Sequence, residues 1–326
     1  MSVRDVIVIG AGPAGLSAAI YLGRAKREVL VVDSGKPMAR WEPDIQNYLG
    51  FPDGISGDDL IDRGRSQAER FGAEFAEDEI VNASGWKGAF AVEGRQGVYE
   101  AKRLLIATGI YHLPPDIEGV SECIGHSMFF CKDCDGFRVE GKTVGIYGWR
   151  NETVEYALAM LLYSPKVAIL TDGREPKWDS QHQGWIRDYS IPVYTREISE
   201  AKRCDGQVQS LGLAGGSEVK FDALFTTRGD VYFNRLAKAL GAAIDGDGEI
   251  VVNECQATSV PGLYAAGCVT PANCQIIIAA GQGAVAAQAI NRDLFEESLV
   301  THSLRRFRQA QVREEQVAPE VTVEGR

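Results

Sequence analysis

The chain has 326 residues, 45% of them hydrophobic and 24% charged, which is enough apolar material for two globular domains. Its formal net charge of −11 excludes nucleic acid as the expected partner, because contacts to phosphates need clustered lysines and arginines. Seven cysteines without framework spacing favour a reducing compartment over a disulfide-stapled secreted protein.

The first predicted elements form a nucleotide-binding unit. The β-branched run at 6–9 predicts a buried parallel strand, and residues 16–24 predict a helix. Between them, residues 10–15 read G-A-G-P-A-G, whose glycines allow a tight turn, close approach of a pyrophosphate and close helix–strand packing. A second strand at 28–32 leads to Asp33, where an acid binds an adenosine ribose and disfavours a 2′-phosphate.

Residues 131–137 read C-K-D-C-D-G-F and carry the main chemical motif of the chain. Two cysteines separated by two residues form either a redox pair or half of a zinc site. A zinc site needs two more ligands, and only His126 lies nearby, without a second C-x-x-C or a paired histidine. The pattern therefore favours an easily reduced disulfide between Cys131 and Cys134 that exchanges electrons with dithiols, and it predicts no metal.

A second strand–turn–helix unit follows, with a degenerate turn. A strand at 143–147 and a helix at 152–162 flank the sequence G-W-R-N, in which Arg150 replaces the glycine that admits a pyrophosphate. After the next strand comes Asp172, spaced from Gly148 much as Asp33 is from Gly10, so we interpret the units as an internal repeat. NADPH is predicted to be a poor ligand, because Asp172 would repel its 2′-phosphate. The candidate residues of this second site are Gly148, Trp149, Arg150, Asn151 and Asp172.

Further segments indicate a flavin by resemblance. Residues 47–57 read N-Y-L-G-F-P-D-G-I-S-G, residues 107–109 read A-T-G, and residues 265–283 begin with A-A-G and end with A-G-Q-G. With the C-x-x-C-D-G-F motif, these segments resemble those that contact flavin in low-molecular-weight thioredoxin reductases, in the same order. The resemblance implies an α/β fold of two Rossmann-like, FAD/NAD(P)-binding domains, each a three-layer ββα structure. It also implies bound FAD and a homodimer.

The same resemblance implies roles for single residues. Cys134 would meet the flavin, Cys131 would exchange with the partner, and Asp135 would move protons to and from the dithiol. Cys268 stands where the family has an aspartate on the ribityl chain of the flavin, which alters one contact. The implied FAD-binding residues are Gly10, Gly12, Pro13, Ala14, Gly15, Asp33, Asn47, Ala107, Thr108, Gly109, Gly267, Cys268, Gln275 and Ile276.

The five cysteines outside the motif are expected to be mostly small buried side chains. A second disulfide between Cys268 and Cys274 is the alternative for that pair, because both flank the predicted flavin site.

The degenerate second turn resembles the branch of this superfamily that lacks the NADPH motifs. That branch includes diflavin-linked disulfide oxidoreductases of oxygenic photosynthetic bacteria, which hold a second FAD there and pass electrons from dithiol to flavin. Trp149, Trp178, Trp185 and Tyr189 are expected to pack in the core of this domain. The alternative is a stacking platform for a second flavin.

We expect a discontinuous FAD domain of residues 1–113 and 246–310, a central domain of residues 114–245 and a tail of residues 311–326. The breaker residues at 114–115 and 246–248 supply the predicted linkers. The sequence around Phe307 is interpreted as a solvated terminus. The alternative is that it reaches the active site or the other subunit.

The leading functional hypothesis is an FAD enzyme that oxidises a thioredoxin-like protein or a small dithiol through Cys131–Cys134, without NADPH. One alternative is a thioredoxin reductase fed by NAD(P)H or ferredoxin, because disulfide exchange runs either way according to the potentials. The other is a non-catalytic flavin redox sensor. With no signal peptide at the N-terminus, we expect a cytoplasmic protein. A quinone acceptor would place it at a membrane surface.

Overall fold

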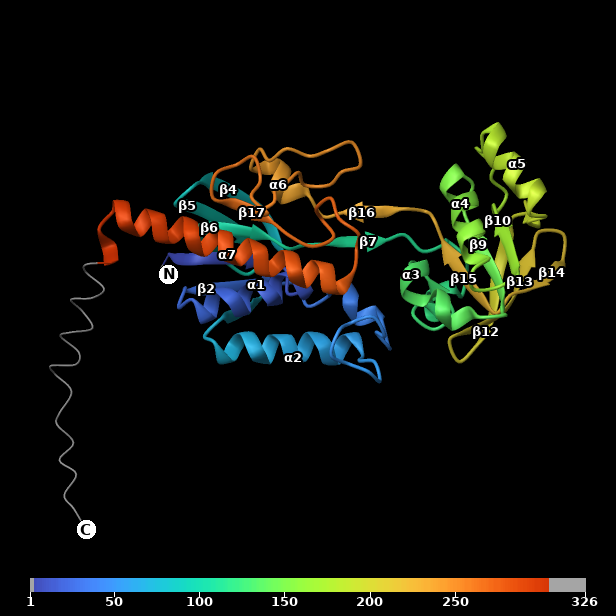
Figure 1. Cartoon of the computed structure of the whole chain (residues 1–326), viewed down its shortest axis with the longest axis horizontal. Helices are drawn as coiled ribbons and strands as arrows, with labels where there is room; N and C mark the ends of the chain where they lie inside the picture. The colour runs from blue at the N-terminus through green and yellow to red at the C-terminus, as the bar shows by residue number, and fades with distance from the viewer. Residues whose placement is uncertain (1–2, 305–326) are drawn as a thin grey trace, which may run out of the picture.

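Two α/β units joined by a two-stranded ribbon make up the protein (Figure 1). The computed structural model describes residues 3–304. The ribbon consists of β7 (Ile110–His112) and β16 (Asp230–Tyr232), which pair antiparallel. The chain passes from the larger unit to the smaller one after β7 and returns along β16, so the smaller unit is an insertion in the larger one.

The larger unit is built on a seven-stranded sheet of order β3-β2-β1-β6-β5-β4, with β17 also paired to β6. Five strands run parallel, namely β3, β2, β1, β6 and β17. Strands β4, β5 and β6 form an antiparallel meander. The elements are β1 (Arg4–Ile9), α1 (Pro13–Arg24), β2 (Val29–Asp33), α2 (Gly57–Arg70), β3 (Glu74–Glu77), β4 (Ile80–Trp86), β5 (Ala89–Gly94), β6 (Val98–Ile106), α6 (Arg235–Ala239), β17 (Leu263–Ala265) and α7 (Ile276–Val300).

Strand β1 lies at the centre of this unit and is buried on both faces. Val6 and Val8 belong to the core between the sheet and helices α1 and α7, and Ile7 and Ile9 belong to the core on the opposite face. This explains why the strand is a continuous β-branched run rather than an alternating one. The predicted strand, turn and helix of the first unit are therefore confirmed, with α1 starting at Pro13.

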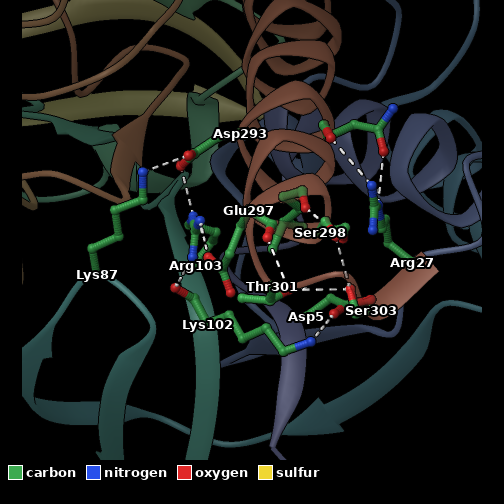
Figure 2. Close-up of polar contacts among 12 residues, drawn as sticks. Asp5, Arg27, Lys87, Lys102, Arg103, Asp293, Glu297, Ser298, Thr301 and Ser303 are labelled. Carbon is green, nitrogen blue, oxygen red and sulfur yellow. Dashed lines mark hydrogen bonds and ion pairs between the residues drawn. The ribbon is translucent and has the colours of Figure 1, made fainter. Parts of the chain in front are cut away.

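Helix α7 is fixed to the sheet by a network of ion pairs (Figure 2). Arg103 of β6 is fully buried, and its guanidinium pairs with Asp293 at 2.6 Å and with Glu297 at 2.5 Å. Lys87 approaches Asp293 from the β4–β5 turn at 2.6 Å. The network sets the position of α7 along the sheet and therefore the place where its N-terminus meets the second unit.

The smaller unit has a five-stranded parallel sheet of order β11-β10-β9-β15-β8 and a three-stranded antiparallel sheet of order β12-β13-β14. This arrangement confirms the prediction of two Rossmann-like units. The elements of the smaller unit are β8 (Met128–Phe129), α3 (Lys132–Asp135), β9 (Thr143–Tyr147), α4 (Asn151–Met160), β10 (Lys166–Leu170), α5 (Ser180–Asp188), β11 (Val193–Tyr194), β12 (Ile198–Cys204), β13 (Gln207–Leu213), β14 (Ser217–Lys220) and β15 (Ala223–Thr226).

The return to the larger unit lies earlier than the expected boundary at residue 245. Leu236 and Ala237 of α6 are buried in the same core cluster as Ile7 and Leu104 of the large sheet, so residues 234–245 belong to the larger unit. Residues 246–248 instead form a tight turn, closed by the bond between the Asp245 amide and the Glu249 carbonyl. Their glycines shape a surface turn and do not mark a crossing.

The predicted tail at 311–326 and the segment around Phe307 lie outside the described residues. Within residues 3–304, no helix has both the length and the apolar character needed to cross a membrane.

Candidate functional site

A cavity of about 840 Å³ lies where the two units meet. It brings together the glycine-rich turn after β1, the segment 107–109 after β6, and the loop that leads into α7. Cys131, Cys134 and Asp135 line it from the smaller unit. Of the expected FAD-binding residues, all but Gly15 line this cavity. The lining also includes Arg40, Trp41 and Phe130, which no motif in the sequence singled out.

The turn between β1 and α1 has the backbone geometry that a bound pyrophosphate requires. A Cβ on Gly15 would lie 1.9 Å from the carbonyl oxygen of Gly10, so the helix can approach the strand only without a side chain there. At Gly12 a Cβ would meet nothing within 4 Å, which leaves its backbone open to the cavity. The N-terminus of α1 therefore offers free amides and a positive dipole end to an anion.

Asp33 is held at the end of β2 by two backbone amides. One carboxylate oxygen accepts from the Ala11 amide at 2.8 Å and the other from the Gly35 amide at 2.7 Å. Each oxygen keeps a lone pair for a ribose hydroxyl. The cavity, the glycine turn and this carboxylate fit the adenosine diphosphate part of FAD.

Cys131 and Cys134 are joined in a disulfide at the start of α3. The amide of Cys134 points at the sulfur of Cys131, 3.1 Å away. From the larger unit, the side-chain amide nitrogen of Gln275 lies 3.4 Å from the Cys131 sulfur and 3.3 Å from the Cys134 sulfur. Asn47 holds that side chain by donating to its oxygen at 3.0 Å. The disulfide is thus packed against the FAD-type unit, with both sulfurs on the cavity.

Asp135 is a buried carboxyl beside the disulfide. Burial raises its pKa to about 7, and the negative charges of Glu42 and Asp44 add to this effect. The Arg138 guanidinium, whose Nε lies 3.0 Å from the carboxylate, opposes the shift in pKa. A group that titrates near neutral pH next to two sulfurs is suited to accept and return the thiol protons. Burial also raises the pKa of Glu42, a second carboxyl of the cavity that the sequence did not indicate.

Replacing Asp135 with asparagine should have two effects. Dithiol oxidation should slow about 100-fold near neutral pH, because the proton acceptor is lost. The free energy of unfolding should also lose a pH dependence. Between pH 3.8 and about 7, folded Asp135 keeps a proton that the unfolded chain releases, so stability falls as pH rises through this window.

Urea unfolding at about pH 5 and about pH 8 tests the second effect, and D135N should flatten the difference between the two values. Asp133 is the matched control, because it lies two residues away and its side chain is 67% exposed. An unchanged pH profile in D135N would show that this carboxyl does not titrate in the expected window.

The expectation for the remaining cysteines was largely wrong. Cys123 is buried, but Cys204 and Cys255 are exposed, and Cys268 and Cys274 form a second disulfide. The loop between β17 and α7 folds back on itself and brings their Cα atoms to 4.9 Å. Both cysteines line the same cavity as the first disulfide.

The acid expected in the second nucleotide site makes hydrogen bonds within its own unit. Asp172 lies beyond the end of β10, and its two oxygens accept from the Tyr147 hydroxyl and from the Ile198 amide, both at 2.7 Å. It ties β10 to β9 and β12, whereas Asp33 faces the large cavity. The spacing in the sequence reflects the shared strand–turn–helix plan, and a role of Asp172 in nucleotide binding stays a prediction.

The turn after β9 is covered by residues 174–179 of the same unit. The carbonyl of Trp149 accepts from the Lys177 amide at 2.7 Å, and the Asn151 side chain bonds to Asp179 at 2.9 and 3.1 Å. The Arg174 guanidinium lies 4.2 Å from the centre of the Trp149 ring. Gly148 directly follows β9, and Arg150 is exposed at the N-cap of α4. Residues 174–179 therefore lie against this turn.

The aromatic residues of the second unit mostly pack against its core. Trp149, Trp178 and Trp185 are partly buried against the two core clusters of this unit, whereas Tyr189 is 60% exposed. Packing accounts for the tryptophans. Among residues 3–304, no group of three or more His, Cys, Asp or Glu side chains could hold a metal ion.

Comparisons with known proteins agree with this geometry. Residues 4–290 match the pyridine nucleotide-disulphide oxidoreductase family. A thioredoxin reductase of Listeria innocua is 32% identical over 88% of this chain and 92% of its own length. The crystal structure of HlmI superposes with a TM-score of 0.86 at 31% identity, covering 94% of this chain and 98% of that one. The thioredoxin reductase TrxB of Bacillus anthracis gives 0.83 at 27% identity, covering 90% and 99%. The chain therefore belongs to the pyridine nucleotide-disulphide oxidoreductase family, as a flavin-dependent disulfide oxidoreductase of the thioredoxin-reductase type.

Proposed function

We propose that this protein oxidises a dithiol at Cys131–Cys134, delivers the electrons to bound FAD and does not use NADPH. The observation that carries the proposal is the shared cavity. The disulfide, the buried Asp135 and the turn suited to FAD line one space, whereas the second nucleotide turn is covered. FAD would supply a two-electron acceptor there. A thioredoxin-like protein or a small dithiol is the proposed partner.

The residues of the cavity account for the thiol chemistry. A substrate thiolate attacks Cys131, the bond between Cys131 and Cys134 breaks, and Cys134 leaves as a thiolate. The second thiol of the substrate then attacks the mixed disulfide and releases Cys131. The substrate leaves as a disulfide, and the protein holds a dithiol. Asp135 accepts a proton in this sequence, because its pKa of about 7 lets it change charge at neutral pH.

The contacts of the second turn argue against NADPH. Arg174 would be the basic group available for a 2′-phosphate, but its guanidinium lies over Trp149. Asp172 contributes negative charge at the end of β10. The amide of Lys177 bonds to the turn itself. A nicotinamide dinucleotide would have to displace several of these contacts at once.

Disulfide reduction is the second candidate function, with ferredoxin or NAD(P)H as the electron source. The relatives that are named thioredoxin reductases favour it. The same sulfurs and the same carboxyl serve this direction, because thiol–disulfide exchange is reversible.

A second FAD in the central unit, as in the diflavin-linked enzymes that the sequence resembles, is a separate part of the proposal. The exposed Arg150 at the N-terminus of α4 supports it, since arginine pairs well with a pyrophosphate. The bonds of Lys177 and Asp179 to the turn oppose it. The ratio of released FAD to polypeptide decides, since a ratio near two requires flavin in the central unit and a ratio near one excludes it.

Anaerobic bleaching of the flavin absorbance tests the main proposal. Dithiothreitol should bleach the flavin of the purified protein, and equal amounts of NADPH or NADH should leave it oxidised. The variant C131S/C134S should not be bleached by dithiothreitol. Rapid bleaching by NADPH, or by reduced ferredoxin in place of a dithiol, would reverse the proposed direction and establish the reductase.

A further inference from the structure

The Cys268–Cys274 disulfide has no part in the function proposed above. It closes the loop between β17 and α7, and both of its cysteines are half-buried in the wall of the cavity. The residues at the tip of the loop, 271–273, are exposed.

The two disulfides line the same cavity and are linked through one residue. Gln275 follows Cys274 directly, and its side chain contacts the sulfurs of both Cys131 and Cys134. One residue therefore connects the two disulfides across the boundary between the two units.

The position of Cys274 before the N-terminus of α7 favours the thiolate form of its side chain over the thiol. Gln275 is the N-cap of the 25-residue helix α7, whose first turn holds no acidic residue and whose cap makes no side-chain hydrogen bond. The amides at this end of α7 and its dipole favour a negative charge at Cys274. A stabilised thiolate is a good leaving group in disulfide exchange.

We propose that Cys268–Cys274 is a second redox-active disulfide, which accepts an electron pair from the Cys131–Cys134 dithiol. A thiolate of that dithiol attacks the Cys268–Cys274 bond, and one of these cysteines leaves as a thiolate. The remaining thiol then attacks the mixed disulfide, which re-forms the Cys131–Cys134 bond and releases the other cysteine. Two electrons and two protons pass from one pair to the other, and no further reagent is consumed.

The exchange would let the protein hold two electron pairs on sulfur before the flavin is reoxidised. The inference rests on the proposed function only for the arrival of electrons at Cys131–Cys134, and a chemical dithiol can supply these in a test.

The test follows each thiol by alkylation and peptide mass spectrometry. The flavin-loaded protein is treated anaerobically with dithiothreitol, quenched with acid at intervals and alkylated with N-ethylmaleimide. In the wild type, both pairs should become alkylated. In C131S/C134S, alkylation of Cys268 and Cys274 should be at least about tenfold slower, because the attacking dithiol is absent. The matched control is C204S/C255S, which removes two exposed free cysteines and should match the wild type.

Two results would overturn the inference. Cys268–Cys274 could stay oxidised in the wild type while Cys131–Cys134 is fully reduced, which would make it a structural bond. Alternatively, it could be reduced equally fast in C131S/C134S, which would show direct reduction from solvent. If Cys131–Cys134 itself resists dithiothreitol, the proposed function fails instead. Flavin content and unfolding midpoint, measured for each variant, show that the fold is kept.

Discussion

Replacing Cys134 with serine should lower the rate of dithiol oxidation by about a thousandfold or more. The reason is that the substrate disulfide forms only when Cys131 and Cys134 can exchange their own bond for it. Cys134 also lies 3.3 Å from the Gln275 side chain of the larger unit, and the other cysteine of the smaller unit that lines the cavity is its partner Cys131. Anaerobic stopped-flow reduction with dithiothreitol measures the effect.

Cys204→Ser is the control for this experiment, because Cys204 is an exposed free cysteine of the same unit and lies at the end of β12. It should keep the wild-type rate. Serine variants of Cys131 and Cys134 that still turn over dithiols would refute the enzyme proposed here. Turnover by the wild type that is lost in these variants would exclude a non-catalytic flavin redox sensor.

Replacing Gly283 with alanine should destabilise the protein by about 3 kcal/mol and release the flavin. Gly283 lies on α7 where that helix crosses α1, and a Cβ there would lie 2.0 Å from the backbone carbonyl of Ala14. The obstacle is backbone rather than a flexible side chain, so one of the helices must move. Helix α1 begins at the glycine-rich turn that lines the cavity, and Gln275 is the N-cap of α7, so movement of either helix distorts the cavity.

Gly281→Ala provides a matched control on the same helix. Gly281 is exposed, and a Cβ there would meet nothing within 4 Å. Alanine should therefore stabilise the helix by about 0.5–1 kcal/mol through propensity alone. Thermal unfolding and the FAD content of both variants give the comparison. Equal stability of the two variants would mean that α1 and α7 adjust to each other without cost.

The first unit could be predicted from sequence because its information is local. The β-branched run of β1, the glycines of the turn and the acid at the end of β2 lie within about 30 residues, and each has a direct backbone reason. The position of the dithiol on the cavity could be predicted only from the resemblance to a known family. That position depends on contact with Gln275, which lies more than 140 positions away in the sequence.

The end of the inserted unit was predicted at the wrong residue, because glycines such as those at 246–248 mark turns and do not by themselves mark domain boundaries. Helix α6 has five residues, too few to show a helical period, and its membership of the larger core depends on contacts with β1 and β6. The second disulfide was not favoured for a similar reason. Its loop conformation places Cys268 and Cys274 together, and sequence spacing alone does not fix that distance.

Asp172 shows what the spacing of a motif leaves open. The repeat of strand, turn and helix is real, but the Tyr147 hydroxyl and the Ile198 amide each donate to one oxygen of Asp172 and tie it to β9 and β12. Asp33 also accepts two hydrogen bonds, but it lines the large cavity, whereas Asp172 does not. Which space a carboxylate faces depends on its three-dimensional neighbours, which a spacing of 24 residues in the sequence cannot reveal.

The pairing of His112 with Asp230 has a consequence for how such proteins can be assembled. These two residues face each other across the ribbon, so the two ends of the inserted unit leave the larger unit as neighbours in a hairpin. The Cα atoms of cross-strand partners lie about 5 Å apart, a gap that a two-residue turn closes. The inserted unit can therefore be removed or exchanged at these two positions without breaking the seven-stranded sheet of the larger unit.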